Sequence, residues 1–191
     1  MKEIGGYFGT EHLASGVQSV LHSDGIFVNS GHNAFSLILQ SLLNIKHIYI
    51  PRYVCHIIPD TLRELHISFS YYQINFNLEI SVFPELQDGE YILVINYFGV
   101  KDQYINKLIG DYGGRLIVDN VQAFFYNMTP SINSFYSVRK FFGVPDGGIA
   151  YSSVPQRSLI SDSNPVVFNS HQIKRDTMGA EAGFREYRNN E

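Results

Sequence analysis

The stretch Ile117-Val118-Asp119-Asn120-Val121-Gln122-Ala123 decides the fold of this chain, together with the later segment Phe135-Tyr136-Ser137-Val138-Arg139-Lys140. In the first stretch an apolar run ends in an acid, and a glutamine follows three residues later. In the second, a lysine stands after another apolar run, shortly before the turn Asp146-Gly147-Gly148. Runs without polar alternation are typical of strands buried on both faces, as in a parallel sheet covered by helices. We therefore expect a carboxylate and an amine at the ends of neighbouring strands.

The rest of the chain extends this pattern to a complete sheet. Seven segments rich in β-forming residues predict strands, at Ile26–Asn29, His47–Ile50, Ile67–Tyr72, Tyr91–Tyr97, Arg115–Asp119, Ser134–Val138 and Gly148–Ser152. Apolar residues at helical spacing predict helices over Asn33–Leu43, Ile57–Leu65 and Gln103–Tyr112. Strands and helices alternate early in the chain, and a β-β end follows. This order predicts an α/β protein, a three-layer α/β/α domain with a mainly parallel seven-stranded sheet.

Composition excludes several classes of function. The chain has 191 residues and a net charge of -4, and its basic residues never exceed two in a row, so we expect no nucleic-acid partner. No apolar run approaches membrane-spanning length, and no signal peptide is evident. The single cysteine, Cys55, fits a reducing compartment, and we expect a cytoplasmic protein. The seven histidines show no metal-ligand spacing, so no metal site is expected.

An ordered set of motifs resembles a known family, the fold-type I PLP-dependent aminotransferases, and within it the DegT-type sugar aminotransferases. The motifs that carry the resemblance are Ser30-Gly31-His32-Asn33-Ala34, Ile50-Pro51-Arg52-Tyr53-Val54-Cys55, Asn96-Tyr97-Phe98-Gly99, the pair Asp119 and Gln122, and Lys140 with Asp146-Gly147-Gly148. Together they cover roughly residues 26 to 152. The resemblance implies one antiparallel strand in the sheet and pyridoxal 5'-phosphate (PLP) at its carboxyl edge.

The resemblance also assigns roles around the cofactor ring. Lys140 corresponds to the catalytic lysine that forms a Schiff base with the PLP aldehyde, and Asp119 to the carboxylate on the ring nitrogen. Gln122 corresponds to the amide beside the ring hydroxyl. Against these roles, Lys140 could be a surface lysine beside Arg139, and Asp119 could be a strand-end cap. The neighbouring Phe141 and Phe142 favour partial burial of Lys140.

Further residues are expected to hold the phosphate and the face of the ring. Ser30 and Gly31 open the helix that would bind the phosphate, and either Ser134 or Ser137 would add a hydroxyl. Cys55 stands where the family usually stacks an aromatic side chain on the ring, so Tyr53 or His56 is expected there. Adjacent strand residues point to opposite faces, so we expect Cys55 to be a buried structural thiol that does not act with His56.

The function implied is amino transfer from a small-molecule amino donor to a keto-sugar or related carbonyl, by a homodimer. Residues 1–25 are expected to form an N-terminal arm and helix, 26–153 the PLP-binding large domain, and 154–191 a loop and one connecting helix over His171–Glu191. Family members are about twice as long and carry a smaller C-terminal domain, which this chain is expected to lack. An alternative is therefore an inactive PLP-binding remnant, or a subunit completed by a partner chain.

Overall fold

A single mixed sheet forms the centre of the computed structural model, which describes residues 9–10, 21–144, 146–152 and 170–190. Its strands are β1 (Ile26–Val28), β2 (His47–Pro51), β3 (Ser68–Tyr72), β4 (Glu90–Ile95), β5 (Leu116–Asp119), β6 (Asn133–Ser137) and β7 (Gly148–Tyr151). Their order across the sheet is β1-β7-β6-β5-β4-β2-β3. The seven predicted strands are confirmed, with boundaries shifted by one or two residues.

Six of the strands run in one direction. Strand β7 pairs antiparallel with both β1 and β6, whereas the other pairs are parallel, so β1 points the same way as β6. The carboxyl ends of these six strands therefore meet at one edge of the sheet. Loops at this edge of an open parallel sheet are the usual location of ligands.

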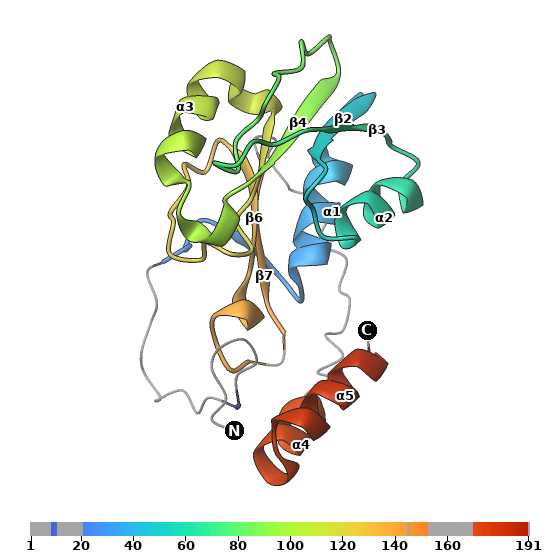
Figure 1. Ribbon diagram of the computed structural model, residues 1–191, viewed down its shortest axis with the longest axis vertical. Helices are drawn as coiled ribbons and strands as arrows, with labels where there is room; N and C mark the ends of the chain where they lie inside the picture. Colours follow the sequence, from blue (N-terminus) through green and yellow to red (C-terminus); the bar gives the residue numbers. More distant parts are fainter. Residues whose placement is uncertain (1–8, 11–20, 145, 153–169, 191) are drawn as a thin grey trace.

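Helices cover both faces of the sheet (Figure 1). Helices α1 (Gly31–Ser41) and α2 (Ile57–Glu64) lie on one face, and α3 (Asp102–Tyr112) lies on the other. Three short 3-10 helices, η1 (Tyr97–Gly99), η2 (Gly113–Arg115) and η3 (Val138–Lys140), connect elements. The expected three-layer arrangement is confirmed.

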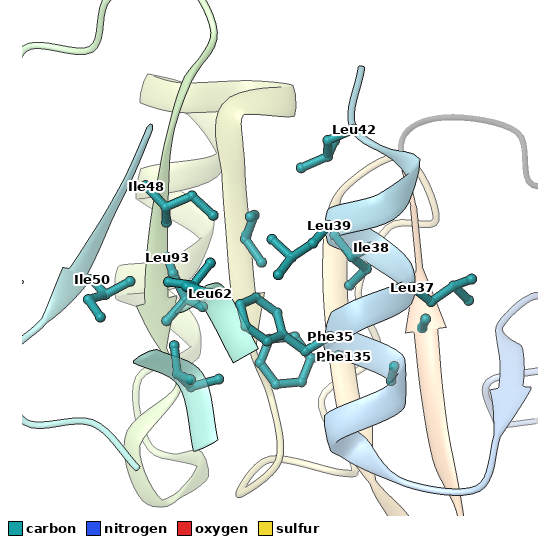
Figure 2. Close-up of a cluster of buried hydrophobic side chains, with 14 of the residues drawn as sticks. Phe35, Leu37, Ile38, Leu39, Leu42, Ile48, Ile50, Leu62, Leu93 and Phe135 are labelled. Atoms are coloured by element: carbon teal, nitrogen blue, oxygen red, sulfur yellow. The ribbon is translucent and has the colours of Figure 1, made fainter. Parts of the chain in front are cut away.

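The core has one hydrophobic cluster on each face. On the α1 side, Figure 2 shows Phe35, Ile38 and Leu39 pointing towards the sheet, and the ring of Phe35 lies 5.0 Å from that of Phe135. On the α3 side, buried aliphatic side chains of α3 pack with β4, β5 and Tyr136. Both faces of the central strands are thus buried, which explains why their sequences lack polar alternation.

A network around β7 fixes the start of α1. The Ser30 hydroxyl caps the helix by accepting a hydrogen bond from the Asn33 amide at 3.1 Å. The Gly147 amide donates to the Asn29 carbonyl, and the Val138 amide donates to the Gly147 carbonyl. A Cβ on Gly148 would lie 2.1 Å from the Ser30 carbonyl oxygen, so only glycine allows this approach. The Asp146-Gly147-Gly148 turn therefore ties the α1 start to the segment that carries Lys140.

The C-terminal segment differs from its prediction. Instead of one helix over His171–Glu191, two helices form, α4 (Ser170–Met178) and α5 (Ala180–Asn190). Gly179 separates them at a φ of +93°, a conformation that favours glycine. Lys174 of α4 pairs with Glu186 of α5 at 2.7 Å, so the helices form a hairpin. The N-terminal arm expected over residues 1–25 lies mostly outside the described residues.

Candidate functional site

A cavity of about 250 Å³ opens at the carboxyl edge of the sheet, on the face that α1 and α2 cover. Its lining comes from the ends of β2, β4, β5 and β6, and consists of Tyr53, Val54, Cys55, Ile95, Tyr97, Phe98, Asp119, Val121, Gln122 and Lys140. Four of the predicted site residues thus meet in one place: Tyr53, Asp119, Gln122 and Lys140.

Asp119 forms the buried acidic side of the cavity. It is the last residue of β5, and only 4% of its surface is exposed. Its Oδ1 accepts a hydrogen bond from the Val121 amide at 2.9 Å. Burial raises the pKa of Asp119 from 3.8 to about 6, while the Val121 hydrogen bond and the charge of Lys140 partly oppose that rise. A nearby cation would stabilise the charged carboxylate.

Lys140 supplies the amine of the cavity from the end of η3. No ion pair within 4 Å joins it to Asp119 in the part of the chain that the structure describes, so a gap separates the two groups. The expected partial burial of Lys140 is wrong, because its side chain is exposed. The flanking Phe141 and Phe142 pack around Phe124 and Phe125.

Gln122 has a structural task as well as a place in the cavity. Its Oε1 accepts a hydrogen bond from the Phe98 amide at 2.9 Å. Phe98 adopts a φ of +56°, which is uncommon for a large side chain and marks local backbone strain. Since the amide oxygen is engaged, the Gln122 NH₂ group remains as the donor that can face a ligand.

Two residues were expected to stack on a ring, and only one of them lines the cavity. Tyr53 is 59% exposed, and its ring stacks on that of Tyr97 at 5.6 Å. His56 lies outside the cavity lining, at the N-cap of α2. The expectation for Cys55 is wrong, because the thiol is exposed and its Sγ lies 4.0 Å from Nδ1 of His56. The two residues occupy a turn before α2, where the alternation of a strand does not hold.

The predicted phosphate-binding residues flank the cavity. A Cβ on Gly31 would lie 3.3 Å from Cβ of Ser137 and 3.4 Å from a methyl group of Val121, which lines the cavity. Ser137 is therefore beside the N-terminus of α1. Ser134 is fully buried and, two residues from Tyr136 on β6, shares its face with the α3-side cluster. The structure brings Ser137, not Ser134, to Gly31.

The N-terminus of α1 adds backbone donors to this region. The Ser30 hydroxyl satisfies the Asn33 amide, and the amides of Gly31 and His32 in the first turn have no hydrogen-bond acceptor among the described residues. Such donors and the helix dipole favour an anion. The site thus combines a helix start whose backbone donors favour an anion, a buried carboxylate and an amine.

A second hollow, of about 660 Å³, lies at the start of α3. It is lined by Lys101, which pairs with Glu79 at 2.6 Å, and by Asp102 and Lys107, and none of the predicted site residues lines it. Within residues 9–10, 21–144, 146–152 and 170–190, no cluster of metal-binding side chains occurs. No helix in those ranges has the length and apolar content required to cross a membrane.

Sequence reasoning gave no role in the site to Tyr97. Tyr97 was expected as the last residue of a strand, but β4 ends at Ile95 and Tyr97 begins η1. Its side chain lines the cavity, and its hydroxyl donates to the Tyr53 carbonyl at 2.6 Å. This contact joins residues 44 positions apart, and no local pattern signals it.

Comparison with solved structures places this architecture among known folds. The chain is similar to 3-amino-5-hydroxybenzoic acid synthase (TM-score 0.53, 14% identity, 67% of this chain) and to PseC, a Helicobacter pylori aminotransferase involved in pseudoaminic acid biosynthesis (0.53, 14%, 68%). It is also similar to GDP-4-keto-6-deoxymannose-3-dehydratase with a trapped PLP–glutamate geminal diamine (0.51, 19%, 68%). The fold is that of the PLP-dependent transferases.

The similarity is one of fold and not of sequence. No protein-family model matches the chain, and no curated protein matches it. The chain spans 38%, 40% and 39% of the length of the synthase, PseC and the dehydratase, respectively. These matches therefore show the fold of this chain, and its ligands and activity are proposed below.

Proposed function

We propose that this chain binds PLP at the carboxyl-edge cavity and belongs to the sugar-aminotransferase type of PLP-dependent enzyme. The observation that carries the proposal is the pair of Asp119 and Lys140, a buried carboxylate and an amine that face one cavity without forming an ion pair. The N-terminus of α1 lies beside it. These three features match the three polar ends of PLP: its ring nitrogen, its aldehyde and its phosphate.

The residues present fit the cofactor chemically. Asp119, buried and with a raised pKa, would be stabilised in its charged form by a protonated ring nitrogen. The amides of Gly31 and His32, with the Ser137 hydroxyl, would hold the phosphate. The Gln122 NH₂ group would donate to the ring hydroxyl, and Tyr53 would lie against the ring. His56 and Ser134 lie away from the cavity, so the proposal gives them no role.

Lys140 carries the catalytic role in this proposal. PLP supplies an aldehyde that condenses with amines and a ring that withdraws electrons from the attached carbon. Lys140 would hold the cofactor through its aldehyde, and Lys140 Nζ would move a proton at the substrate carbon. Asp119 would keep the ring nitrogen protonated. The proposed substrates are an amino donor and a keto-sugar or related carbonyl.

The alternative is a chain that binds PLP without transferring an amino group, or one completed by a partner chain. The exposure of Lys140 favours it, because an open cavity does not keep water from the reacting groups. We further propose a homodimer. Residence in the cytoplasm stays part of the proposal, since the single cysteine is an exposed free thiol.

An absorbance titration with PLP tests the proposal. Wild-type protein is expected to develop the band of a lysine-bound PLP, Lys140→Ala is expected to lose it, and Lys107→Ala, with its lysine on α3, is expected to keep it. Adding glutamate as amino donor then separates the alternatives, since a transferase converts the band and an inactive binder does not. Equal bands in Lys140→Ala and wild type would disprove the assignment.

A further inference from the structure

Two contacts join Tyr97 to Tyr53 across 44 positions of sequence. The rings are stacked, with centroids 5.6 Å apart and planes inclined by 13°. The Tyr97 hydroxyl also donates a hydrogen bond of 2.6 Å to the Tyr53 carbonyl. One contact orients the Tyr53 ring and the other fixes its backbone, so together they hold Tyr53 in one position.

The two tyrosines differ in how they meet solvent. Tyr97 is 5% exposed and is packed in the hydrophobic cluster on the α1 side, whereas Tyr53 is 59% exposed. Burial, the charge of Asp119 and the neighbouring Tyr53 raise the pKa of the Tyr97 phenol well above its ordinary value. The hydroxyl therefore stays protonated and remains a donor to Tyr53 at any physiological pH.

The stacked pair forms the aromatic side of the same cavity that contains Asp119 and Lys140. Phe98 adds a third ring, 6.4 Å from Tyr97, but it is tilted by 43° and does not extend the stack. A planar ring that binds between a carboxylate and an amine needs an apolar surface for its face, and stacked aromatic rings provide one. A mobile surface tyrosine would have to be ordered on binding, at a cost in affinity.

We propose that Tyr97 is a positioning residue, which holds Tyr53 in place as the aromatic wall for a planar ring bound between Asp119 and Lys140. The inference rests on the proposed function for the identity of that ring, PLP. Tyr97 acts through Tyr53 and does not take part in proton transfer.

Three variants test the inference. Tyr97→Phe removes the hydroxyl that bonds Tyr53 and keeps the ring, whereas Tyr97→Leu removes both contacts. Tyr72→Phe is the matched control, because the Tyr72 hydroxyl also donates to a backbone carbonyl from a buried position, that of Leu93 at 2.9 Å, and Tyr72 does not line the cavity. Thermal melts of the ligand-free proteins are expected to show a similar loss for Tyr97→Phe and Tyr72→Phe.

The first readout needs no cofactor. Cys55 is the only cysteine of the chain, is exposed, and follows Tyr53 by two residues. The steady-state anisotropy of a fluorescent maleimide attached to this thiol therefore reports on how firmly the turn is held. We expect the anisotropy to fall in Tyr97→Phe and further in Tyr97→Leu, and to stay at the wild-type value in Tyr72→Phe.

The second readout is the dissociation constant of PLP by absorbance titration. Loss of one hydrogen bond predicts about a 5-fold weaker affinity in Tyr97→Phe, a larger loss in Tyr97→Leu and no change in Tyr72→Phe. If wild-type protein binds PLP and Tyr97→Phe binds it as tightly as Tyr72→Phe, the inference is wrong and the proposed function stands. If wild-type protein does not bind PLP, the proposed function fails, and the role of Tyr97 at that ring fails with it.

Discussion

At the scale of single residues, Asp119 is the most informative side chain. It is a carboxylate at the end of a central strand, 4% exposed, with a backbone amide as its hydrogen-bond donor. Burial of a charge without a close cation destabilises a folded protein, and here it is visible as a raised pKa. Natural proteins accept such a cost at functional sites.

The raised pKa of Asp119 makes a prediction about stability and pH. The folded state binds this proton more tightly than the unfolded chain, so the contribution of Asp119 to the free energy of unfolding falls as pH rises from 3.8 through about 6 and is then constant. We expect Asp119→Asn, which has no charge to bury, to exceed the wild type in ligand-free stability by about 1–3 kcal/mol at pH 7–8.

The difference between Asp119→Asn and the wild type should shrink towards zero at about pH 3 and below, where the wild-type carboxyl is largely protonated in both states. Urea unfolding at a series of pH values measures it. An Asp119→Asn variant that is no more stable than the wild type at pH 7 would show that the carboxylate is not strained. The same substitution is expected to weaken PLP binding, which separates the functional from the structural effect.

At the scale of elements, the sheet could be predicted and the details of its edge could not. Strands buried on both faces, such as Ile92–Ile95 and Leu116–Val118, leave a clear apolar signal. Helix α1 begins at Gly31 and not at the predicted Asn33, because Ser30 caps the helix. The break at Gly179 was missed, since its positive φ divides a pattern that reads as continuous. The cavity is formed by contacts between loops that are distant in sequence, and no local sequence pattern predicts such contacts.

Two glycines allow a test of how the turn at β7 positions α1. A methyl group on Gly148 would lie 2.1 Å from the Ser30 carbonyl oxygen and 2.3 Å from its carbon, and backbone atoms cannot move aside cheaply. We expect Gly148→Ala to destabilise the protein by about 2–4 kcal/mol and to weaken PLP binding, because it displaces the start of α1.

Gly110→Ala is the control for this prediction. Gly110 lies inside α3, and a methyl group added there would meet no heavy atom within 4 Å among the described residues. Its replacement is expected to stabilise the protein by up to about 1 kcal/mol. Urea unfolding of both variants measures the difference, and equal effects would contradict the close packing described for Gly148.

At the scale of the whole molecule, the carboxyl edge carries apolar side chains that the described residues leave uncovered. Tyr53, Phe98, Val100 and Phe125 are all exposed and follow strands of the parallel part of the sheet. Exposed apolar surface beside a cavity is typical of an interaction site. It supports the proposed homodimer, with an interface expected to exceed roughly 1,000 Å² in total.

Charge substitutions test the dimer. Val100→Glu, at the carboxyl edge, is expected to shift the protein towards monomer, because an uncompensated charge in an apolar interface is costly. Leu43→Glu is the control, since Leu43 is equally exposed but lies beyond the end of α1, at the opposite edge of the sheet. Light scattering across protein concentrations measures the mass. A wild-type monomer at high concentration would contradict the proposal.

The central claim is that Lys140 is the residue to which PLP attaches. Borohydride reduction of the PLP-treated protein, followed by peptide mass spectrometry, tests it most directly, because reduction makes the attachment permanent and the label identifies the lysine. The account predicts a pyridoxyl group on the peptide that contains Lys140. In the double variant Asp119→Asn/Gly148→Ala, treated at PLP concentrations that saturate the wild type, it predicts none on that peptide. A label distributed over surface lysines such as Lys46 and Lys107, with Lys140 unmodified, would contradict it.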